Sequence, residues 1–146
     1  MDVDENKLKL ALENGASAAI NPMDEDAASK VLEITGGNAS VAIDFVGSEQ
    51  STAFGTNLLR KGGKYIIVGL YGGELKMPLP LIPIMERTIQ GSYVGSPGDM
   101  EELMELVRAN KIDPIPVEKR SASEAYQTLL DLKDGKIIGR AALMHD

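Results

Sequence analysis

The sequence predicts an α/β fold in which helices cover both faces of a parallel, doubly wound sheet. Short apolar runs of strand length recur along the chain, and the clearest of them spans residues 64–70 around Ile66-Ile67-Val68. Segments with helical periodicity, capping residues and glycine stops separate these runs. Strands buried on both faces have near-continuous apolar runs, and parallel strands need helical crossovers. The alternation therefore indicates a parallel sheet.

The first helix is predicted to begin after Asp4, which can cap it, and to end at Asn14-Gly15. Leu8 and Leu12 share one face of that helix, as core residues would. A brief buried strand is expected at residues 18–20, because the run Ala-Ala-Ile is bounded by Asn and Pro.

The second helix is expected to follow residues 24–26, where three acids match the positive end of a helix dipole. It would bury Ala27 and Val31 and end at Gly36-Gly37. Residues 41–46 then form an apolar run of strand length that contains one acid.

The middle of the chain continues this alternation. Ser48 is predicted to cap a helix that runs to Leu58, and Gly62-Gly63 turns the chain into the strand at 64–70. Three prolines limit residues 77–83 to a short helical turn, and residues 88–94 have the composition of a strand.

The remaining segments are less regular. A helix is expected from Asp99 to residues 110–111, and residues 115–117 could form an edge strand. Residues 121–124 match a capping box for a helix that ends at Gly135, and a last strand is expected at 141–144. With no repeat, low-complexity segment or long linker, residues 1–146 are predicted to form a single compact unit.

Composition excludes several classes of function. The chain has no cysteine, and His145 is its one histidine, so disulfides, a thiol nucleophile and a Cys/His zinc cluster are not expected. A formal net charge of -7 and a pI near 4.7 argue against a nucleic-acid partner. The N-terminus is acidic and no apolar run is long enough to cross a bilayer. These features predict a cytoplasmic protein without a membrane partner.

Ligands of open α/β sheets bind at the carboxyl ends of the strands, which here are residues 44–47, 68–70 and 91–94. Each of these ends contains a glycine, which would let a ligand approach the backbone closely. No phosphate-loop, nucleophile-elbow or zinc-protease motif occurs, and the glycines of residues 69–73 are interpreted as an ordinary turn. Asp44 is interpreted as a hydrogen-bonded structural acid, so no catalytic and no metal-binding residue is assigned.

A set of motifs nevertheless resembles the C-terminal part of the medium-chain, zinc-type alcohol dehydrogenases. The resemblance runs in order along essentially the whole chain. It is carried by Met1 to Leu8, Asn14-Gly15-Ala16, Asp44-Phe45-Val46-Gly47, the run from Gly62 to Gly69, Gly91 to Gly95, and Gly139-Arg140.

The resemblance implies a truncated Rossmann-like sheet. Residues 1–94 would be a partial dinucleotide-binding domain that lacks the first strand, the phosphate loop and most of the second strand. Residues 95–146 would be the C-terminal segment that returns to the catalytic domain. The free edge left on the strand at 41–46 predicts a homo-oligomer built by pairing of sheet edges.

The resemblance also implies contacts with NAD. Asp2 matches the acid that binds the adenosine ribose and favours NAD over NADP, and Lys7 matches a basic residue beside the same ribose. Without the resemblance, both residues would be interpreted as charges at the start of a helix. Val46 and Gly47 match the edge of the adenine pocket.

The other implied contacts concern the rest of the dinucleotide. Val68, Ser92 and Val94 match positions whose backbone groups hold the nicotinamide carboxamide. Arg140 matches a residue that pairs with the pyrophosphate, although on its own it would be interpreted as a surface cation at a strand end.

The catalytic domain of this family holds the zinc ligands, and the absence of cysteine indicates that neither zinc site is present here. We therefore expect a fragment of an NAD-dependent oxidoreductase that is inactive alone, binds NAD or its adenosine half weakly at best, and binds no zinc. The alternative is a non-catalytic nucleotide-binding or self-assembling α/β module. Whether the chain is itself an enzyme is left open by the sequence.

Overall fold

The computed structural model describes residues 1–145 and divides into two compact units that meet at Val94 and Gly95. The sequence led us to expect a single compact unit. The division arises because the strands form two separate parallel sheets, one in each unit, and no ladder within the described chain joins them. Each unit is described by itself below.

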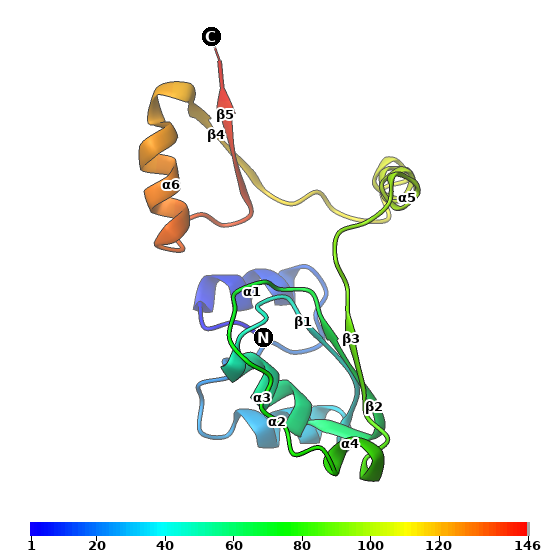
Figure 1. Cartoon of the computed structure of the whole chain (residues 1–146). Helices are drawn as coiled ribbons and strands as arrows, with labels where there is room; N and C mark the ends of the chain where they lie inside the picture. The colour runs from blue at the N-terminus through cyan, green and yellow to red at the C-terminus, as the bar shows by residue number, and fades with distance from the viewer. Residues whose placement is uncertain (146) are drawn as a thin grey trace. The chain divides into compact units, whose positions relative to one another are not determined.

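The first unit is an α/β unit around a three-stranded parallel sheet in the order β1-β2-β3 (Figure 1). This confirms the predicted fold class, since helices alternate with parallel strands. Its elements are α1 (Glu5–Glu13), α2 (Ala27–Ile34), β1 (Ala39–Asp44), α3 (Glu49–Asn57), β2 (Leu59–Ile67), α4 (Leu81–Ile84) and β3 (Thr88–Gly91).

The predicted caps of α1 and α3 are confirmed. The Asp4 carboxylate accepts hydrogen bonds from the backbone amides of Asn6 and Lys7, at 2.8 and 3.3 Å. Ser48 accepts from the Ser51 amide at 3.1 Å, and the Ser51 hydroxyl accepts from the Ser48 amide at 3.0 Å in return. These contacts satisfy amides that have no partner within a helix, so the helices begin where the sequence predicts.

The strand expected at residues 18–20 is not formed, and that prediction is wrong. Ile20 is buried, so the apolar run is in the core, but the segment has no hydrogen-bonded neighbour. A strand requires a ladder, and β1 pairs only with β2 within the described residues.

Three strands end earlier than the sequence predicts, and the first is β1, which ends at Asp44 rather than residue 46. β2 ends at Ile67 rather than residue 70, and β3 ends at Gly91 rather than residue 94. Beyond Ile67 the amides of Val68 and Gly69 both donate to the Asp44 carbonyl, so the chain leaves the ladder and bends onto the end of β1. The early ends create the loops that carry the predicted site residues.

The core of the first unit lies between the sheet and its helices. Leu59 and Tyr65 of β2 are its largest fully buried side chains. By contrast, Val41 and Ile43 of the edge strand β1, and Phe45 directly after it, are 51%, 54% and 75% exposed. The other buried residues of the unit are Leu8, Ile20, Ala27, Asp44, Thr52, Thr56, Leu58 and Gly63.

The second unit contains a two-stranded parallel sheet, β4 paired with β5. The capping box at residues 121–124 is confirmed, since the Glu124 carboxylate accepts from the Ser121 amide at 2.9 Å. The preceding helix, α5 (Pro97–Arg108), is capped by Ser96 rather than by Asp99. The elements are α5 (Pro97–Arg108), β4 (Val117–Ser121), the 3-10 helix η1 (Ala122–Glu124), α6 (Ala125–Lys133) and β5 (Arg140–Met144).

An ion-pair network fixes α6 against β4 in this unit. Arg120 donates to Asp131 at 2.7 Å and to Glu118 at 2.9 Å, and the Thr128 hydroxyl lies 3.4 Å from the same guanidinium. None of the helices within residues 1–145 has both the length and the apolar character that a bilayer crossing needs.

Candidate functional site

Asp44, at the carboxyl end of β1, holds the loop that follows this strand. Its side chain is only 7% exposed, and Oδ1 accepts hydrogen bonds from the backbone amides of Val46 and Gly47 at 2.9 and 3.0 Å. Oδ2 accepts from the Ser51 hydroxyl at 2.8 Å and from the Tyr65 hydroxyl at 2.7 Å. The prediction that Asp44 is a hydrogen-bonded structural acid is therefore confirmed.

These contacts fix the protonation states of both groups. Burial raises the pKa of Asp44, but the hydrogen bonds from Gly47, Tyr65, Ser51 and Val46 outweigh it, and the net pKa lies below its usual value. Burial, together with the neighbouring Asp44 carboxylate, raises the pKa of Tyr65 above its usual value. The core therefore contains an anionic carboxylate and a neutral phenol at physiological pH.

The loops after β1 and β2 are in direct backbone contact. The amides of Val68 and Gly69 donate to the Asp44 carbonyl at 2.9 and 3.0 Å. A Cβ on Gly69 would overlap the Val46 carbonyl group, and a Cβ on Gly47 would overlap the Gly69 carbonyl group. These two glycines are therefore required by the contact of the loops with each other. The sequence analysis did not predict this contact between the loops, and the approach of a ligand at these glycines stays a prediction.

Two more backbone hydrogen bonds connect the loops a few residues further along the chain. Tyr71 donates to the Val46 carbonyl at 3.0 Å, and Gly72 donates to the Gly47 carbonyl at 3.1 Å. Backbone hydrogen bonds therefore connect the two loops along their length at the carboxyl edge of the sheet.

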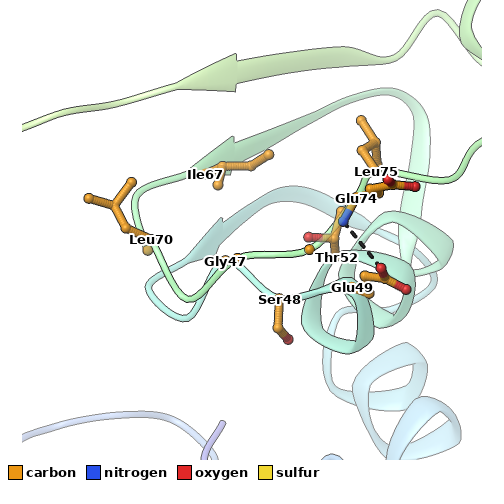
Figure 2. Close-up of a pocket in the computed structure, with 11 residues that line it drawn as sticks. Gly47, Ser48, Glu49, Thr52, Ile67, Leu70, Glu74 and Leu75 are labelled. Carbon is orange, nitrogen blue, oxygen red and sulfur yellow. Dashed lines mark hydrogen bonds between the residues drawn. The ribbon is translucent and has the colours of Figure 1, made fainter.

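A pocket of about 360 Å³ lies beside these loops, at the start of α3 (Figure 2). The Glu49 carboxylate accepts from the Glu74 amide at 3.2 Å and from the Lys76 ammonium at 3.3 Å. The hydrogen bond with Lys76, and then that with the Glu74 amide, lowers the pKa of Glu49 below its usual value. Because both oxygens already have partners, this carboxylate is not a free acid or base.

A larger cavity, of about 700 Å³, follows the free edge of β1. Asp2 and Val46 both line it, so the structure brings together two residues that the sequence predicted to bind adenosine. Oδ1 of Asp2 accepts from the Asp4 amide at 3.0 Å. Lys7 is half-buried on α1, and it is not among the residues that line this cavity.

The backbone groups of Val68, Ser92 and Val94 differ in whether they have a hydrogen-bond partner within the protein. The amides of Val68 and Ser92 donate to the carbonyls of Asp44 and Ile67. Within the described chain, no hydrogen bond engages the Val68 and Ser92 carbonyls or the Val94 amide. Two acceptors and one donor are the complement of a primary carboxamide, which has two N–H donors and one oxygen acceptor.

Val94 has an unusual backbone conformation. Its φ is +47°, in the left-handed region that a β-branched residue rarely adopts. Strained residues of this kind concentrate at ligand sites, where the surrounding structure holds them in place. The strain is an observation independent of the free backbone groups.

Arg140 is the first residue of β5 and belongs to the second unit. Its guanidinium is exposed and donates to the Gly139 carbonyl at 3.0 Å. Its contact with a pyrophosphate remains a prediction.

The sequence analysis did not identify Tyr65, Ser51 or Gly55 as parts of the site. A tyrosine in the middle of a buried strand needs a hydrogen-bond partner for its hydroxyl. Asp44, the one acid on the neighbouring strand, is the signal in the sequence that could have identified this partner. Gly55 lies where a Cβ would come within 2.5 Å of the Tyr65 ring.

No group of three or more His, Cys, Asp or Glu residues within residues 1–145 is arranged to hold a metal ion. Two of the three acids at residues 24–26 instead pair with Lys30, whose ammonium lies 2.8 Å from Asp26 and 3.5 Å from Asp24.

Comparison with known proteins identifies relatives along the whole chain. The NAD-dependent alcohol dehydrogenase of Sulfurisphaera tokodaii is 35% identical over 145 residues, which are 99% of this chain and 42% of the relative. The enzyme of the same name from Sulfolobus acidocaldarius is 38% identical over 144 residues, with 98% and 41% covered. This chain thus spans about two fifths of the length of the curated relatives it matches.

Solved structures and a family profile agree with these relatives. The alcohol dehydrogenase of Aeropyrum pernix superposes with a TM-score of 0.88 at 37% identity, covering 99% of this chain and 41% of that one. Benzyl alcohol dehydrogenase from Acinetobacter calcoaceticus superposes at 0.84 with 26% identity, covering 98% and 41%. The profile described as zinc-binding dehydrogenase matches residues 1–109. Together with the partial parallel sheet and its strand-end loops, these similarities establish that the chain belongs to the zinc-binding dehydrogenase family and corresponds to the C-terminal part of its NAD-dependent alcohol dehydrogenases.

Proposed function

We propose that the first unit binds NAD across the carboxyl ends of β1, β2 and β3, as part of an enzyme that transfers a hydride between an alcohol and this cofactor. The observation that carries the proposal is the set formed by the Val68 carbonyl, the Ser92 carbonyl and the Val94 amide. These groups would hold the nicotinamide carboxamide and so fix which face of the ring meets the substrate. When bound, NAD supplies the ring carbon that accepts or gives up the hydride.

The adenosine half would lie in the cavity beside β1. Asp2 lines this cavity, and its Oδ2 has no hydrogen-bond partner within the described residues, so it can accept from the ribose hydroxyls. A carboxylate there would repel a 2′-phosphate, which favours NAD over NADP. Val46 and Gly47 would form the edge of the adenine pocket, Lys7 would lie beside the ribose, and Arg140 would pair with the pyrophosphate.

Residues 1–94 would thus act as a partial dinucleotide-binding domain, and residues 95–146 as the segment that returns to a catalytic domain. The 146-residue polypeptide contains no cysteine and no glycine-rich phosphate loop. We therefore expect this polypeptide to bind NAD weakly, to bind no zinc and to turn over no alcohol when it is assayed alone.

A fluorescence titration with NADH tests the binding proposal. We expect saturable binding at high micromolar to millimolar concentrations, and weaker binding of NADPH. Asp2→Ala should weaken NADH binding and reduce the preference over NADPH, whereas Asp24→Ala, in a solvent-facing ion pair, should do neither. Absence of saturation by millimolar NADH would refute the proposal.

The exposed edge of β1 supports a second candidate function, a self-assembling module. Val41 and Ile43 are exposed on a strand whose backbone is unpaired on one side, Phe45 is exposed directly after it, and such an edge is a template for another strand. We propose that the isolated polypeptide forms a homo-oligomer through this edge. Sedimentation should give a mass that falls toward the monomer value in Ile43→Lys, whereas a monodisperse 15.6 kDa wild-type monomer would contradict the proposal.

A further inference from the structure

A single residue connects both loops that carry the proposed cofactor contacts. The Asp44 carboxylate binds the amides of Val46 and Gly47, and the Asp44 carbonyl binds the amides of Val68 and Gly69. Because Asp44 contacts two adjacent loops through two different groups, it is a candidate for a role beyond packing.

Planarity of the peptide bond connects these contacts to the cofactor site. The Gly69 amide and the Val68 carbonyl belong to the same trans peptide group, so they point in opposite directions. Because the Gly69 amide is bound to the Asp44 carbonyl at 3.0 Å, the Val68 carbonyl must point away from Asp44. The direction of a proposed carboxamide acceptor is therefore set by Asp44.

The carboxylate in turn fixes the loop from which these carbonyls project. By accepting from the amides of Val46 and Gly47, Oδ1 fixes the two peptide groups that contain the carbonyls of Phe45 and Val46. The Val46 carbonyl accepts from the Tyr71 amide of the loop after β2, and the Gly47 carbonyl, one peptide group further along, accepts from the Gly72 amide. Without the carboxylate, the loop after β1 loses both of these hydrogen bonds, and the Val46 carbonyl that accepts from Tyr71 is no longer held in its orientation.

We propose that Asp44 is a positioning residue of the cofactor site: its carboxylate holds the loop after β1, and through that loop it orients the Val68 carbonyl toward the nicotinamide carboxamide. This inference rests on the proposed function for its ligand, but the orientation of the loops does not depend on the ligand.

Asparagine at this position should preserve the arrangement. Its Oδ1 can accept from the same two amides, while its amide group can donate to the hydroxyls of Ser51 and Tyr65. Both hydroxyls have other acceptors within reach, since Ser51 Oγ lies 3.2 Å from the Ser48 carbonyl and the Tyr65 hydroxyl lies 3.1 Å from the Ser51 carbonyl. Alanine offers none of these contacts.

The test compares Asp44→Asn, Asp44→Ala and a matched control, Thr56→Val. Thr56 is buried on α3 and its hydroxyl donates within the helix to the Thr52 carbonyl at 2.7 Å, so its loss affects stability without touching either loop. For each variant of the full chain, we would measure NADH affinity by fluorescence at a temperature where it is folded. Hydrogen exchange of the Val46, Gly47 and Gly69 amides would be measured by NMR without cofactor.

The proposal predicts that Asp44→Ala loses at least about tenfold in NADH affinity and in the protection of the loop amides. Asp44→Asn and Thr56→Val should both stay within about threefold of wild type in these measurements. If Asp44→Ala keeps wild-type loop protection, or if Asp44→Asn loses as much as Asp44→Ala, the proposal is overturned. Failure of the wild-type chain to bind NADH would refute the proposed function alone, because the exchange data would still decide the role of Asp44.

A measurement on the wild-type chain covers the case in which Asp44→Ala does not fold. In an NMR titration between about pH 6 and pH 2, the Val46 and Gly47 amides should report protonation of Asp44 below its ordinary value of 3.8. The Gly69 amide should follow the same transition. A Gly69 amide that ignores this transition would contradict the coupling of the two loops.

Discussion

The Tyr65 hydroxyl donates a 2.7 Å hydrogen bond to Oδ2 of Asp44, which joins the middle of β2 to the end of β1 inside the core. Tyr65 is 1% exposed, so neither group can exchange this contact for water. This hydrogen bond connects the charged Asp44 carboxylate, at the end of β1, to the buried core around Tyr65. Stability of the core and order of the strand-end loops should consequently depend on the same few atoms.

Removal of the hydroxyl in Tyr65→Phe should destabilise the first unit by about 1.5–3 kcal/mol, the range for a hydrogen bond to a charged group. Urea unfolding followed by circular dichroism should show a lower midpoint with an unchanged slope. Tyr126→Phe is the control, because the side chain of Tyr126 is 75% exposed and should contribute within about 0.5 kcal/mol. Equal effects of the two substitutions would contradict the importance of the Asp44 contact.

Gly55→Ala should destabilise the protein although alanine is the better helix former. Helix propensity alone predicts a gain of about 1 kcal/mol. A Cβ at this position would lie 2.5 Å from Cε2 of Tyr65, however, and relief of that overlap should cost about 1–3 kcal/mol. Thermal unfolding measures the net effect.

Gly98→Ala in α5 serves as the comparison for that experiment. A Cβ at Gly98 would meet only Ser96 Oγ, at 3.6 Å, so this substitution should be neutral or stabilise by up to about 1 kcal/mol. A stabilising Gly55→Ala would show that α3 and Tyr65 are not packed as described.

The stability of the first unit should fall in acid because Asp44 is ionised in the fold. The pKa of Asp44 is lower in the folded chain than its ordinary value of 3.8, so the folded state binds the proton less tightly than the unfolded state does. The contribution of Asp44 is therefore fully present above about pH 4 and is lost as pH falls through the lower, folded-state pKa.

Urea midpoints measured at several pH values for wild type and Asp44→Asn check this expectation. The difference between the two proteins should be constant from about pH 5 to pH 7 and should shrink below about pH 4. A difference that does not change with pH would mean that Asp44 is not the group that titrates.

Asp131→Asn should loosen the second unit selectively. Hydrogen bonds from Arg120 and then Gln127 lower the pKa of Asp131, and the carboxylate holds the Arg120 guanidinium at 2.7 Å. Hydrogen exchange at β4 and β5 should therefore accelerate, while exchange at β1 and β2 should not change. Asp134→Asn, which removes only an exposed pair with Lys136, is the control. Equal acceleration in both units would contradict their division at Val94.

Local chemistry in the sequence was sufficient to predict the helix starts at Asp4, Ser48 and Ser121, because a cap depends on residues that are three positions apart. The ends of β2 and β3 could not be predicted in the same way. They depend on bonds between distant residues, such as the one from the Val68 amide to the Asp44 carbonyl.

Dependence on residues that are distant in the sequence also explains the other differences between the predictions and the structure. Ile20 is apolar and buried as predicted, but a strand at residues 18–20 would also require a neighbour. Gly47 and Gly69 looked like sites of ligand approach until the structure showed each filling the space beside the other loop. The ligand contacts predicted at the carboxyl edge of the sheet stay predictions, whereas the close approach of the two loops at these glycines was not predicted from the sequence.

The most direct test of cofactor binding is an NMR titration of the isotopically labelled chain with NAD, followed at the Val94 amide. This amide has no hydrogen-bond partner within the described chain and is proposed to donate to the carboxamide oxygen. We predict a downfield, saturable shift of the Val94 amide with NAD. With AMP, which lacks the nicotinamide, only resonances near Asp2 and Val46 should shift. A Val94 amide that does not move with NAD, or that moves equally with AMP, would contradict the account.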